Sequence, residues 1–250
     1  MDNLIVYIFI FILGSAIGSF LNVVIYRVPL GKSIISPPSS CPKCGAKIKP
    51  WHNIPILSWI ILGGKCANCK EPISIRYPII EFLGGLLAVI IYMKFQKIDI
   101  WFAINLAVFY TLFALSIIDL DYKAVPDSLN LLALTLAFFS SADILQNIKN
   151  ALLMMGLLSL IRFYVSYVIK KEALGEGDII VAGTMGALIG LKPSLIAIFI
   201  ASLIAIFPSL YIRIKNKDLE LPFVPFLALA TFIVWYFKDY FLYIWSILYE

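Results

Sequence analysis

The sequence is poor in charge, and this absence excludes an ordinary soluble domain. Only 14% of its 250 residues are charged and 62% are hydrophobic, whereas soluble domains are about 25% charged and about 45–50% apolar. The mean hydropathy of +0.95 points the same way. We therefore expect a polytopic membrane protein with almost no separate soluble domain, whose chemistry sits in loops or at helix ends.

No small-residue cleavage site follows the first apolar run, residues 4–26, so we interpret this run as a retained helix and not as a signal peptide. Further apolar runs suit helices in a hydrocarbon core of about 30 Å. The prediction is an all-α fold with about eight transmembrane helices. They are expected near residues 4–26, 79–93, 100–118, 128–141, 150–169, 179–191, 194–212 and 222–237, with an aromatic-rich tail over 239–250.

The positive charge is distributed unevenly between the predicted loops. If the N-terminus lies outside the membrane, 14 of the 20 Lys and Arg residues fall on the cytoplasmic side, five on the other side, and Arg162 inside a span. The positive-inside rule favours this orientation. The net charge of +5 is thus a topology signal, and no nucleic-acid partner is expected. Inverted-repeat symmetry, which marks many transporters, is not visible.

All four cysteines lie in one polar stretch. Cys41 and Cys44 form one CxxC pair, and after 21 intervening residues Cys66 and Cys69 form a second. Such spacing is typical of a tetrahedral zinc site, and four thiolates leave no open coordination position, so its role would be structural. Disulfides are the alternative, which a reducing cytoplasmic loop disfavours.

The cysteine stretch also defines the expected domain organisation. We predict a first transmembrane helix over residues 1–26, a cytoplasmic zinc-binding loop over 27–78, and a transmembrane core over 79–250. The single histidine, His52, falls in the loop. Because four cysteines already complete a ligand set, we interpret His52 as an unliganded loop residue.

Two carboxylates are predicted to share one membrane face. Asp119 ends one predicted helix and Asp178 begins another, and with the N-terminus outside both ends face the cytoplasm. A close pair of carboxylates, one charged and one protonated, can activate water as base and acid. Helix dipoles would favour ionisation of Asp178, at a helix N-terminus, over Asp119, at a C-terminus. The plain alternative is that both are solvated acids at helix ends.

Together with their neighbours, these residues resemble the type IV prepilin peptidase family, which are membrane aspartyl proteases with a GxGD motif. The resemblance covers nearly the whole chain. The matching segments, in chain order, are residues 18–29, the two CxxC pairs with NIPILSW between them, IRYPIIE ending at Glu81, IIDLDYKAVPD around Asp119, GEGD ending at Asp178, and LPFVPF beginning at Leu221.

This resemblance implies that Asp119 and Asp178 are the catalytic pair of a leader peptidase. The family cleaves the basic leader of type IV prepilins and type II secretion pseudopilins at the cytoplasmic membrane face. It also implies N-methylation of the new N-terminus with S-adenosylmethionine, an activity associated with the cysteine-bearing loop. One departure is Ile180, which stands where members often have lysine, so any electrostatic help from that lysine is absent here.

Three further residues are candidates for binding substrate or methyl donor. Glu81 could hold an ammonium group, or be an ordinary acid near a helix N-terminus. Asn22 could line the same site, or make a hydrogen bond between helices. Glu176, with Glu172 beside it, could meet a basic leader, although solvated loop charges are the alternative.

Other residues are expected to be structural. Gly14 and Gly18, spaced GxxxG, predict a close contact between helices. Asp121 and Asp127 are expected to be solvated or to cap a helix. Arg162, in the middle of a predicted span, needs a partner that the sequence does not identify.

Two other classes of function stay open from the residues alone. Intramembrane acids also serve transporters and proton relays, although these usually place them near the midplane on broken helices. A non-catalytic scaffold built on the zinc loop is the other class. As a peptidase, the protein would have prepilins and the lipid bilayer as its partners.

Overall fold

The computed structural model describes residues 2–172, 174–215 and 221–249, and in these ranges every regular element is helical. The helices are α1 (Asp2–Arg27), α2 (Leu57–Ile61), α3 (Arg76–Phe95), α4 (Ile100–Tyr122), α5 (Asp127–Phe138), α6 (Ile144–Ile169), α7 (Glu176–Ile189), α8 (Leu191–Lys215), α9 (Val224–Tyr236) and α10 (Lys238–Tyr249), with short 3-10 turns at Val28–Leu30 and Pro50–His52. The all-α class predicted from the sequence is confirmed.

Among the described residues, five helices are long and apolar enough to span a membrane, namely α1, α3, α4, α6 and α8. The pair α9 and α10 makes a sixth candidate if the two are counted as one broken span, bent by 84°. Helices α5, α7 and α9 have 12, 14 and 13 residues, so each rises only about 18–21 Å. Length and composition therefore support a multi-pass membrane protein with five or six candidate spans, fewer than the eight predicted.

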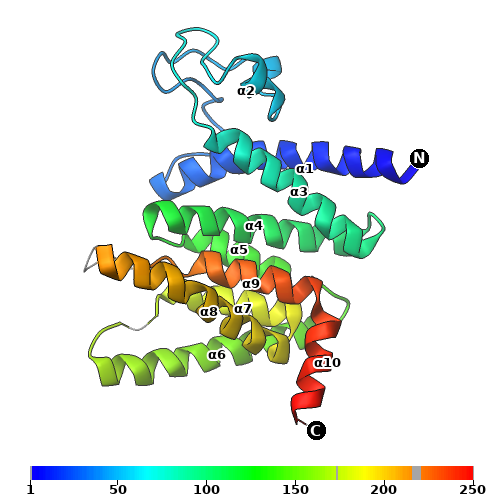
Figure 1. Ribbon diagram of the computed structural model, residues 1–250, viewed down its shortest axis with the longest axis vertical. Coiled ribbons are helices and arrows are strands. Elements are labelled where there is room, and N and C mark those ends of the chain that lie inside the picture. The colour runs from blue at the N-terminus through cyan, green and yellow to red at the C-terminus, as the bar shows by residue number, and fades with distance from the viewer. Residues whose placement is uncertain (1, 173, 216–220, 250) are drawn as a thin grey trace. The chain divides into compact units, whose positions relative to one another are not determined.

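The chain divides into two compact units, residues 1–98 and 99–250. In the first unit, α1 and α3 pack side by side and the loop that carries α2 joins them (Figure 1). Glycines permit this contact, because a Cβ atom on Gly18 would lie 2.9 Å from the Cα atom of Glu81, and one on Gly14 would lie 2.7 Å from Cβ of Ala88. The close helix contact predicted from the GxxxG spacing is confirmed.

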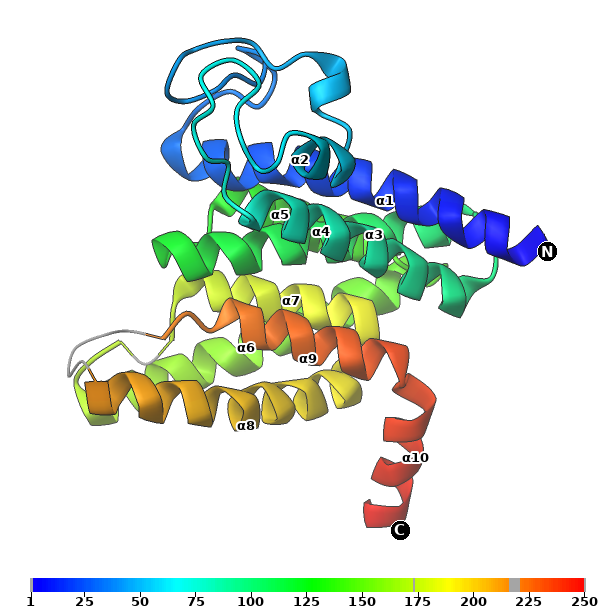
Figure 2. The same ribbon diagram turned by 45° about the horizontal axis from the view of Figure 1, so that its top comes forward.

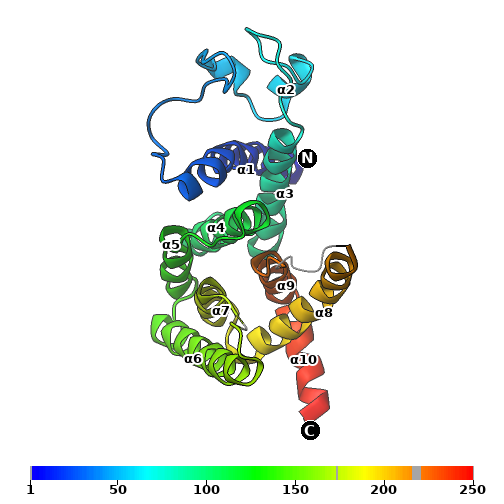
Figure 3. The same ribbon diagram turned by 90° about the vertical axis from the view of Figure 1, so that its left-hand side faces the viewer.

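In the second unit, α7 is the central helix. It contacts α5, α6, α8 and α9, which surround it in Figure 3. Its residues from Val181 to Ile189 are all buried, and its glycines fit the narrow space. A Cβ atom on Gly186 would lie 2.5 Å from the carbonyl oxygen of Asn150 in α6. This packing fixes the start of α7, where Asp178 lies, relative to its neighbours.

The aromatic-rich tail predicted over residues 239–250 forms a helix, α10, which turns sharply away from α9 (Figure 2). Tyr240, Tyr243 and Ile247, spaced three and four residues apart, are each more than half exposed. They form an apolar stripe along one side of the helix. The sequence alone predicts only a tail here, because 12 residues are too few for a separate membrane span.

Candidate active site and metal centre

Asp119 lies in the last turn of α4 and is buried, with 6% of its surface exposed. Its Oδ2 accepts a hydrogen bond of 3.1 Å from the backbone N–H of Val224, the first residue of α9. The first N–H groups of a helix have no partner inside that helix and carry its positive dipole end. Asp119 therefore lies at the C-terminus of α4 and at the N-terminus of α9. The sequence suggested that helix dipoles favour ionisation of Asp178 over Asp119, but in the structure a helix N-terminus lies beside both acids.

Asp178 occupies the first turn of α7. Its Oδ2 accepts a hydrogen bond of 3.2 Å from the backbone N–H of Gly175, the residue that caps this helix. The side chain is half-buried. The charge of Asp119 acts on Asp178, so the two carboxylates lie within electrostatic reach of each other. The structure thus brings together the two acids that the sequence places on separate helix ends.

The loop after Asp119 and the turn before Asp178 are held together by close contacts. A Cβ atom on Gly177 would lie 2.7 Å from Cβ of Val125, so only glycine fits here without displacement. The carbonyl oxygen of Gly177 accepts a hydrogen bond of 2.9 Å from Nδ2 of Asn130, which is completely buried on α5. Sequence reasoning missed Asn130 and Val125, because neither residue type suggests catalysis.

The second polar atom of the Asn130 side chain is its amide oxygen, Oδ1. Among the described residues, its Oδ1 is buried and has no hydrogen-bond partner. A buried carbonyl oxygen without a partner costs about 1–3 kcal/mol. It can accept a hydrogen bond from a water molecule or from a protonated acid nearby.

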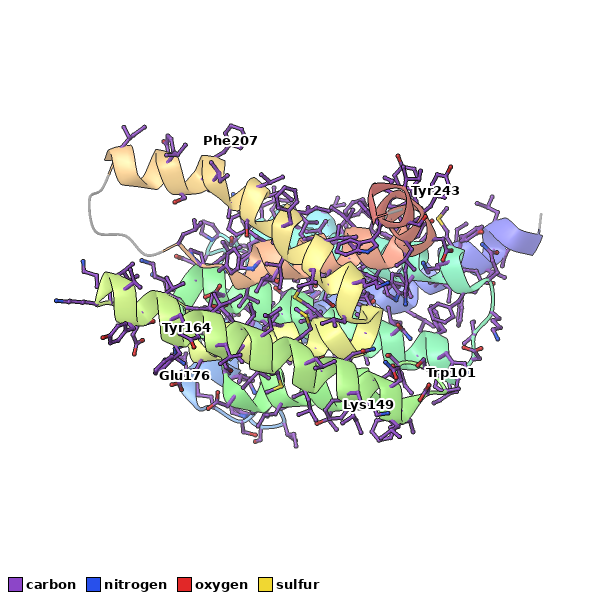
Figure 4. All side chains as sticks on the ribbon, turned by 90° about the horizontal axis from the view of Figure 1, so that it is seen from below. Trp101, Lys149, Tyr164, Glu176, Phe207 and Tyr243 are labelled. Carbon is purple, nitrogen blue, oxygen red and sulfur yellow. The ribbon has the colours of Figure 1, made fainter. Side chains whose placement is uncertain are left out.

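Arg162 has acidic partners that the sequence could not identify. Its guanidinium lies 3.2 Å from Oε1 of Glu176 and 3.7 Å from Oε1 of Glu172. Glu176 lies near Tyr164 at one end of this unit, far from Lys149 and Trp101 at the other (Figure 4). Both glutamates are more than four-fifths exposed, so these ion pairs link α6 to the turn that carries Asp178 at the surface.

Asn22 and Glu81 lie in the first unit and are both buried. Nδ2 of Asn22 donates a hydrogen bond of 3.3 Å to the carbonyl oxygen of Tyr77 in α3. This is the contact between helices that the sequence offered as the alternative for Asn22. Asp121 and Asp127, expected to be solvated or capping, are both exposed, and Asp127 lies in the first turn of α5.

Glu81 supports a strained turn in the cysteine-bearing loop. Its Oε2 accepts a hydrogen bond of 2.7 Å from the backbone N–H of Ile56. Ile56 has φ +62° and ψ −53°, and Leu57 N–H donates to the carbonyl oxygen of Pro55 across it at 2.6 Å. This is a γ-turn with positive φ, a rare and strained conformation for a β-branched residue. Glu81 therefore holds the loop on α3.

The four cysteines form one cluster, with their Sγ atoms all within 4.8 Å of one another. Each CxxC pair is a tight turn with the same hydrogen bonds: Gly45 N–H donates to Cys41 O, and Lys70 N–H donates to Cys66 O. The two turns thus present four sulfur atoms to one point, a donor set that could hold a metal ion. His52 is not part of this cluster.

Hydrogen bonds favour the ionised form of two of these thiols. A bond with the backbone of Ala46, and then one from the side chain of Asn68, lower the pKa of Cys44 to about 6. Bonds with the backbone of Cys69 and Asn68 lower the pKa of Cys66. The thiolate is the form of cysteine that binds metals.

The chain is similar to known proteins over most of its length. Residues 12–95 match the bacterial peptidase A24 N-terminal domain, and residues 106–210 match the type IV leader peptidase family. Similar proteins include the prepilin leader peptidase/N-methyltransferases of Pseudomonas aeruginosa (33% identical, covering 91% of this chain and 89% of that protein) and Xanthomonas campestris (36%, covering 91% and 90%). The protein of this name from Neisseria gonorrhoeae is 31% identical, over 91% and 89%. No solved structure matches significantly. The chain therefore belongs to the peptidase A24 family, the type IV prepilin leader peptidase/N-methyltransferase family.

Proposed function

We propose that this enzyme cleaves the leader of type IV prepilins and type II secretion pseudopilins by activating water between Asp119 and Asp178. The supporting observation is that each acid is held by a backbone N–H, from Val224 and from Gly175, and that Gly177 lies against Val125 of the loop that follows Asp119. One carboxylate takes the proton of the attacking water, and the other protonates or polarises the scissile carbonyl oxygen. No covalent intermediate is needed.

The leader of the substrate is basic, and exposed acids near Asp178 suit it. We assign Glu176 to contact with leader side chains, because it lies two residues from Asp178 and is 83% exposed. Arg162 neutralises part of this charge, which keeps the glutamate oriented. Ile180 offers no charge of its own, so recognition of the leader depends on Glu176 and Glu172.

The second step of the proposed function is methylation of the new N-terminus with S-adenosylmethionine. The names of the relatives support this step. We assign Glu81 and Asn22 to the binding of substrate or methyl donor in this step. The carboxylate of Glu81 suits the ammonium group of either ligand, since one of its oxygens already holds Ile56 and the second is the acceptor.

We propose that the four-cysteine cluster binds a structural zinc ion. The donor set fits, because four Sγ atoms meet within 4.8 Å and hydrogen bonds lower the pKa of Cys44 and of Cys66. The ion would stabilise a loop that has few buried side chains of its own.

We propose that the protein lies in the bacterial inner membrane with its N-terminus outside and its active site at the cytoplasmic face. The three expected segments, residues 1–26, 27–78 and 79–250, correspond to the first span, the zinc-binding loop and the membrane core. Helices α5, α7 and α9 would also lie within the bilayer, sheltered by the longer helices, which gives eight membrane helices. Because these three helices are shorter than a full span, water would have room to reach the depth at which Asp119 lies.

The test is incubation of the purified protein in lipid nanodiscs with a prepilin-type peptide, followed by mass spectrometry of the N-terminus. Loss of the leader, and then a gain of one methyl group only when S-adenosylmethionine is present, is the expected result. An unchanged peptide in several lipids would overturn the peptidase assignment and favour a transporter, proton relay or scaffold. Cleavage without methylation would remove only the second step.

A further inference from the structure

Asn130, on α5, joins the two segments of the chain that carry the acids. Its backbone N–H donates a hydrogen bond of 3.0 Å to the carbonyl oxygen of Pro126, in the loop that follows α4. Its side-chain Nδ2 donates to the carbonyl oxygen of Gly177 at 2.9 Å. The residue is completely buried. Asn130 thus connects the segment after Asp119 with the residue before Asp178.

The bond to Gly177 acts on the backbone of Asp178. The carbonyl oxygen of Gly177 and the N–H of Asp178 belong to the same peptide group, which is planar. Because Asn130 holds this oxygen, it fixes the direction in which the chain enters Asp178. A displacement of about 1 Å in a catalytic group can lower the rate by about 10²-fold. The bond is therefore placed to control the position of the carboxylate.

The amide of Asn130 fits this place in only one orientation. A carbonyl oxygen accepts hydrogen bonds and does not donate them, so the nitrogen of the amide must face Gly177. The amide oxygen then takes the other side, where it is buried. In the part of the chain that the structure describes, only this oxygen and Oγ of Ser15, in the first unit, are buried side-chain atoms without a hydrogen-bond partner. One end of the Asn130 amide is thus satisfied and the other is not.

Fold stability does not explain an asparagine at this place. A buried acceptor without a partner costs more free energy than one neutral hydrogen bond contributes. Gly177 does not need the amide as a partner either, because inside α7 its carbonyl oxygen accepts from the N–H four residues further on. Removal of the whole amide should therefore change the stability of the fold little.

Another buried asparagine of this unit shows the pattern expected for a structural role. Asn147, on α6, donates from Nδ2 to the carbonyl oxygen of Phe138 at 2.9 Å, and its Oδ1 accepts from the hydroxyl of Ser141 at 3.2 Å. Both ends of this amide are satisfied, so it stabilises the fold. Two residues further on, Lys149 lies at the opposite end of the unit from Glu176, the first residue of α7 (Figure 4).

From this contrast we propose that Asn130 is a positioning residue for leader cleavage, which holds the peptide group between Gly177 and Asp178 so that the Asp178 carboxylate stays aligned for the reaction. The inference rests on the proposed function. Asn130 acts through Asp178 and does not contact the substrate. It therefore governs the rate of the chemical step and leaves the binding of the prepilin unchanged.

The test separates alignment of the acid from stability of the fold. Asn130→Leu replaces the amide by an apolar group, and Asn130→Ala removes it without adding volume. Asn147→Leu, which removes an amide that is equally a donor to a carbonyl oxygen but lies far from Asp178, is the matched control. For each protein in nanodiscs, kcat and KM for cleavage of a prepilin-type peptide are measured, together with the midpoint of thermal unfolding.

We expect both Asn130 variants to lose about ten-fold or more in kcat, at a KM within about two-fold of the wild-type value. Their unfolding midpoints should stay close to that of the wild type, because the unsatisfied oxygen is lost together with the bond. Asn147→Leu should show the reverse, a lower midpoint with wild-type kcat.

A normal kcat in Asn130→Ala would overturn the proposal and leave the proposed function intact. A raised KM at unchanged kcat would also overturn it, because Asn130 would then contact the substrate. If neither Asn130 variant folded, or if Asn147→Leu lost as much kcat, the amide would only support the fold, and the proposal would again be wrong. A wild-type protein that does not cleave the peptide would instead refute the proposed function.

Discussion

The backbone N–H of Val224 donates a hydrogen bond to Oδ2 of Asp119 across 105 residues of sequence. The bond fixes the orientation of a buried acid by a backbone group, which only a substitution of Val224 by proline would remove. It also gives a role to the segment LPFVPF, residues 221–226, which has none that the sequence alone reveals. This segment begins α9 at the point where Asp119 needs a donor.

The first prediction concerns the charge of Asp119. Asp119→Asn should lower kcat for leader cleavage by about 10²–10⁴-fold, the usual contribution of general acid–base catalysis. The fold should persist, because the amide oxygen can still accept from Val224. Asp121→Asn, an exposed acid two residues away, is the control and should cleave normally. Appreciable cleavage by Asp119→Asn, measured by peptide mass, would exclude this acid from the chemistry.

The second prediction tests the contact that sets Asp178. Gly177→Ala should reduce cleavage at least about ten-fold, because the new methyl group collides with Val125 and overpacking of this kind costs about 1–3 kcal/mol. Val125→Gly removes the colliding atom. The double variant should therefore recover part of the lost activity, which a double-mutant cycle of kcat/KM and of thermal stability measures.

The control for this pair is Gly156→Ala on α6, where a Cβ atom would meet nothing within 4 Å. It should leave cleavage unchanged. If Gly177→Ala were as active as Gly156→Ala, the close contact between Gly177 and Val125 would not matter for leader cleavage. If Val125→Gly failed to restore any activity, some other contact of Gly177 would be responsible.

Parts of the candidate site that depend on side chains could be predicted from the sequence. Parts that depend on backbone groups could not. Asp119 and Asp178 stand out as charges at the ends of hydrophobic segments, and the spacing of the four cysteines indicates a shared site. The N–H of Val224 has no such signature, because every residue except proline carries one. The partners of Arg162 come from a turn 10 to 14 residues further along the chain, and only the packing of α6 on α7 brings them together.

The number of membrane spans was harder to predict for a related reason. A hydropathy pattern identifies apolar segments but does not show where each helix ends. Asp127 and Phe138 bound a helix of only 12 residues, although the sequence suggested 128–141. Where the helix ends, Asn147 Nδ2 donates to the carbonyl oxygen of Phe138, and Asn105 Nδ2 donates to that of Ser140 just beyond it. These long-range side-chain donors satisfy carbonyl groups that the helix leaves without partners.

The third prediction separates two roles of Glu81. Glu81→Leu leaves the N–H of Ile56 without an acceptor, at a cost of about 1–3 kcal/mol, so trypsin should cut the loop faster at Lys47 and Lys65. Glu81→Gln keeps an acceptor oxygen for Ile56 but loses the charge. It should resist trypsin like the wild type and methylate about ten-fold more slowly at unchanged cleavage. Full methylation by Glu81→Gln would limit Glu81 to a structural role.

The fourth prediction concerns the pH at which the cysteine cluster releases its metal. Protons compete with the ion for thiolates, and a low pKa lets a thiolate resist this competition down to a lower pH. The pKa of Cys44 is lowered to about 6, in part by Asn68, whose Nδ2 lies 3.6 Å from its Sγ. Asn68→Ala raises that pKa towards its ordinary value of about 8.5. As pH falls, the variant should therefore release zinc earlier, at a midpoint about half a pH unit or more above that of the wild type.

A metal-sensitive dye, added to protein loaded with one zinc ion per chain, follows this release as the pH is lowered. Gln96→Ala, which also removes an amide but lies at the far end of α3, should release zinc at the wild-type pH. A chelator added at neutral pH should remove the ion from all three proteins and make the loop sensitive to trypsin, because four thiolates without a cation repel one another. Identical midpoints for Asn68→Ala and the wild type would mean that Cys44 is not the ligand whose protonation starts the release.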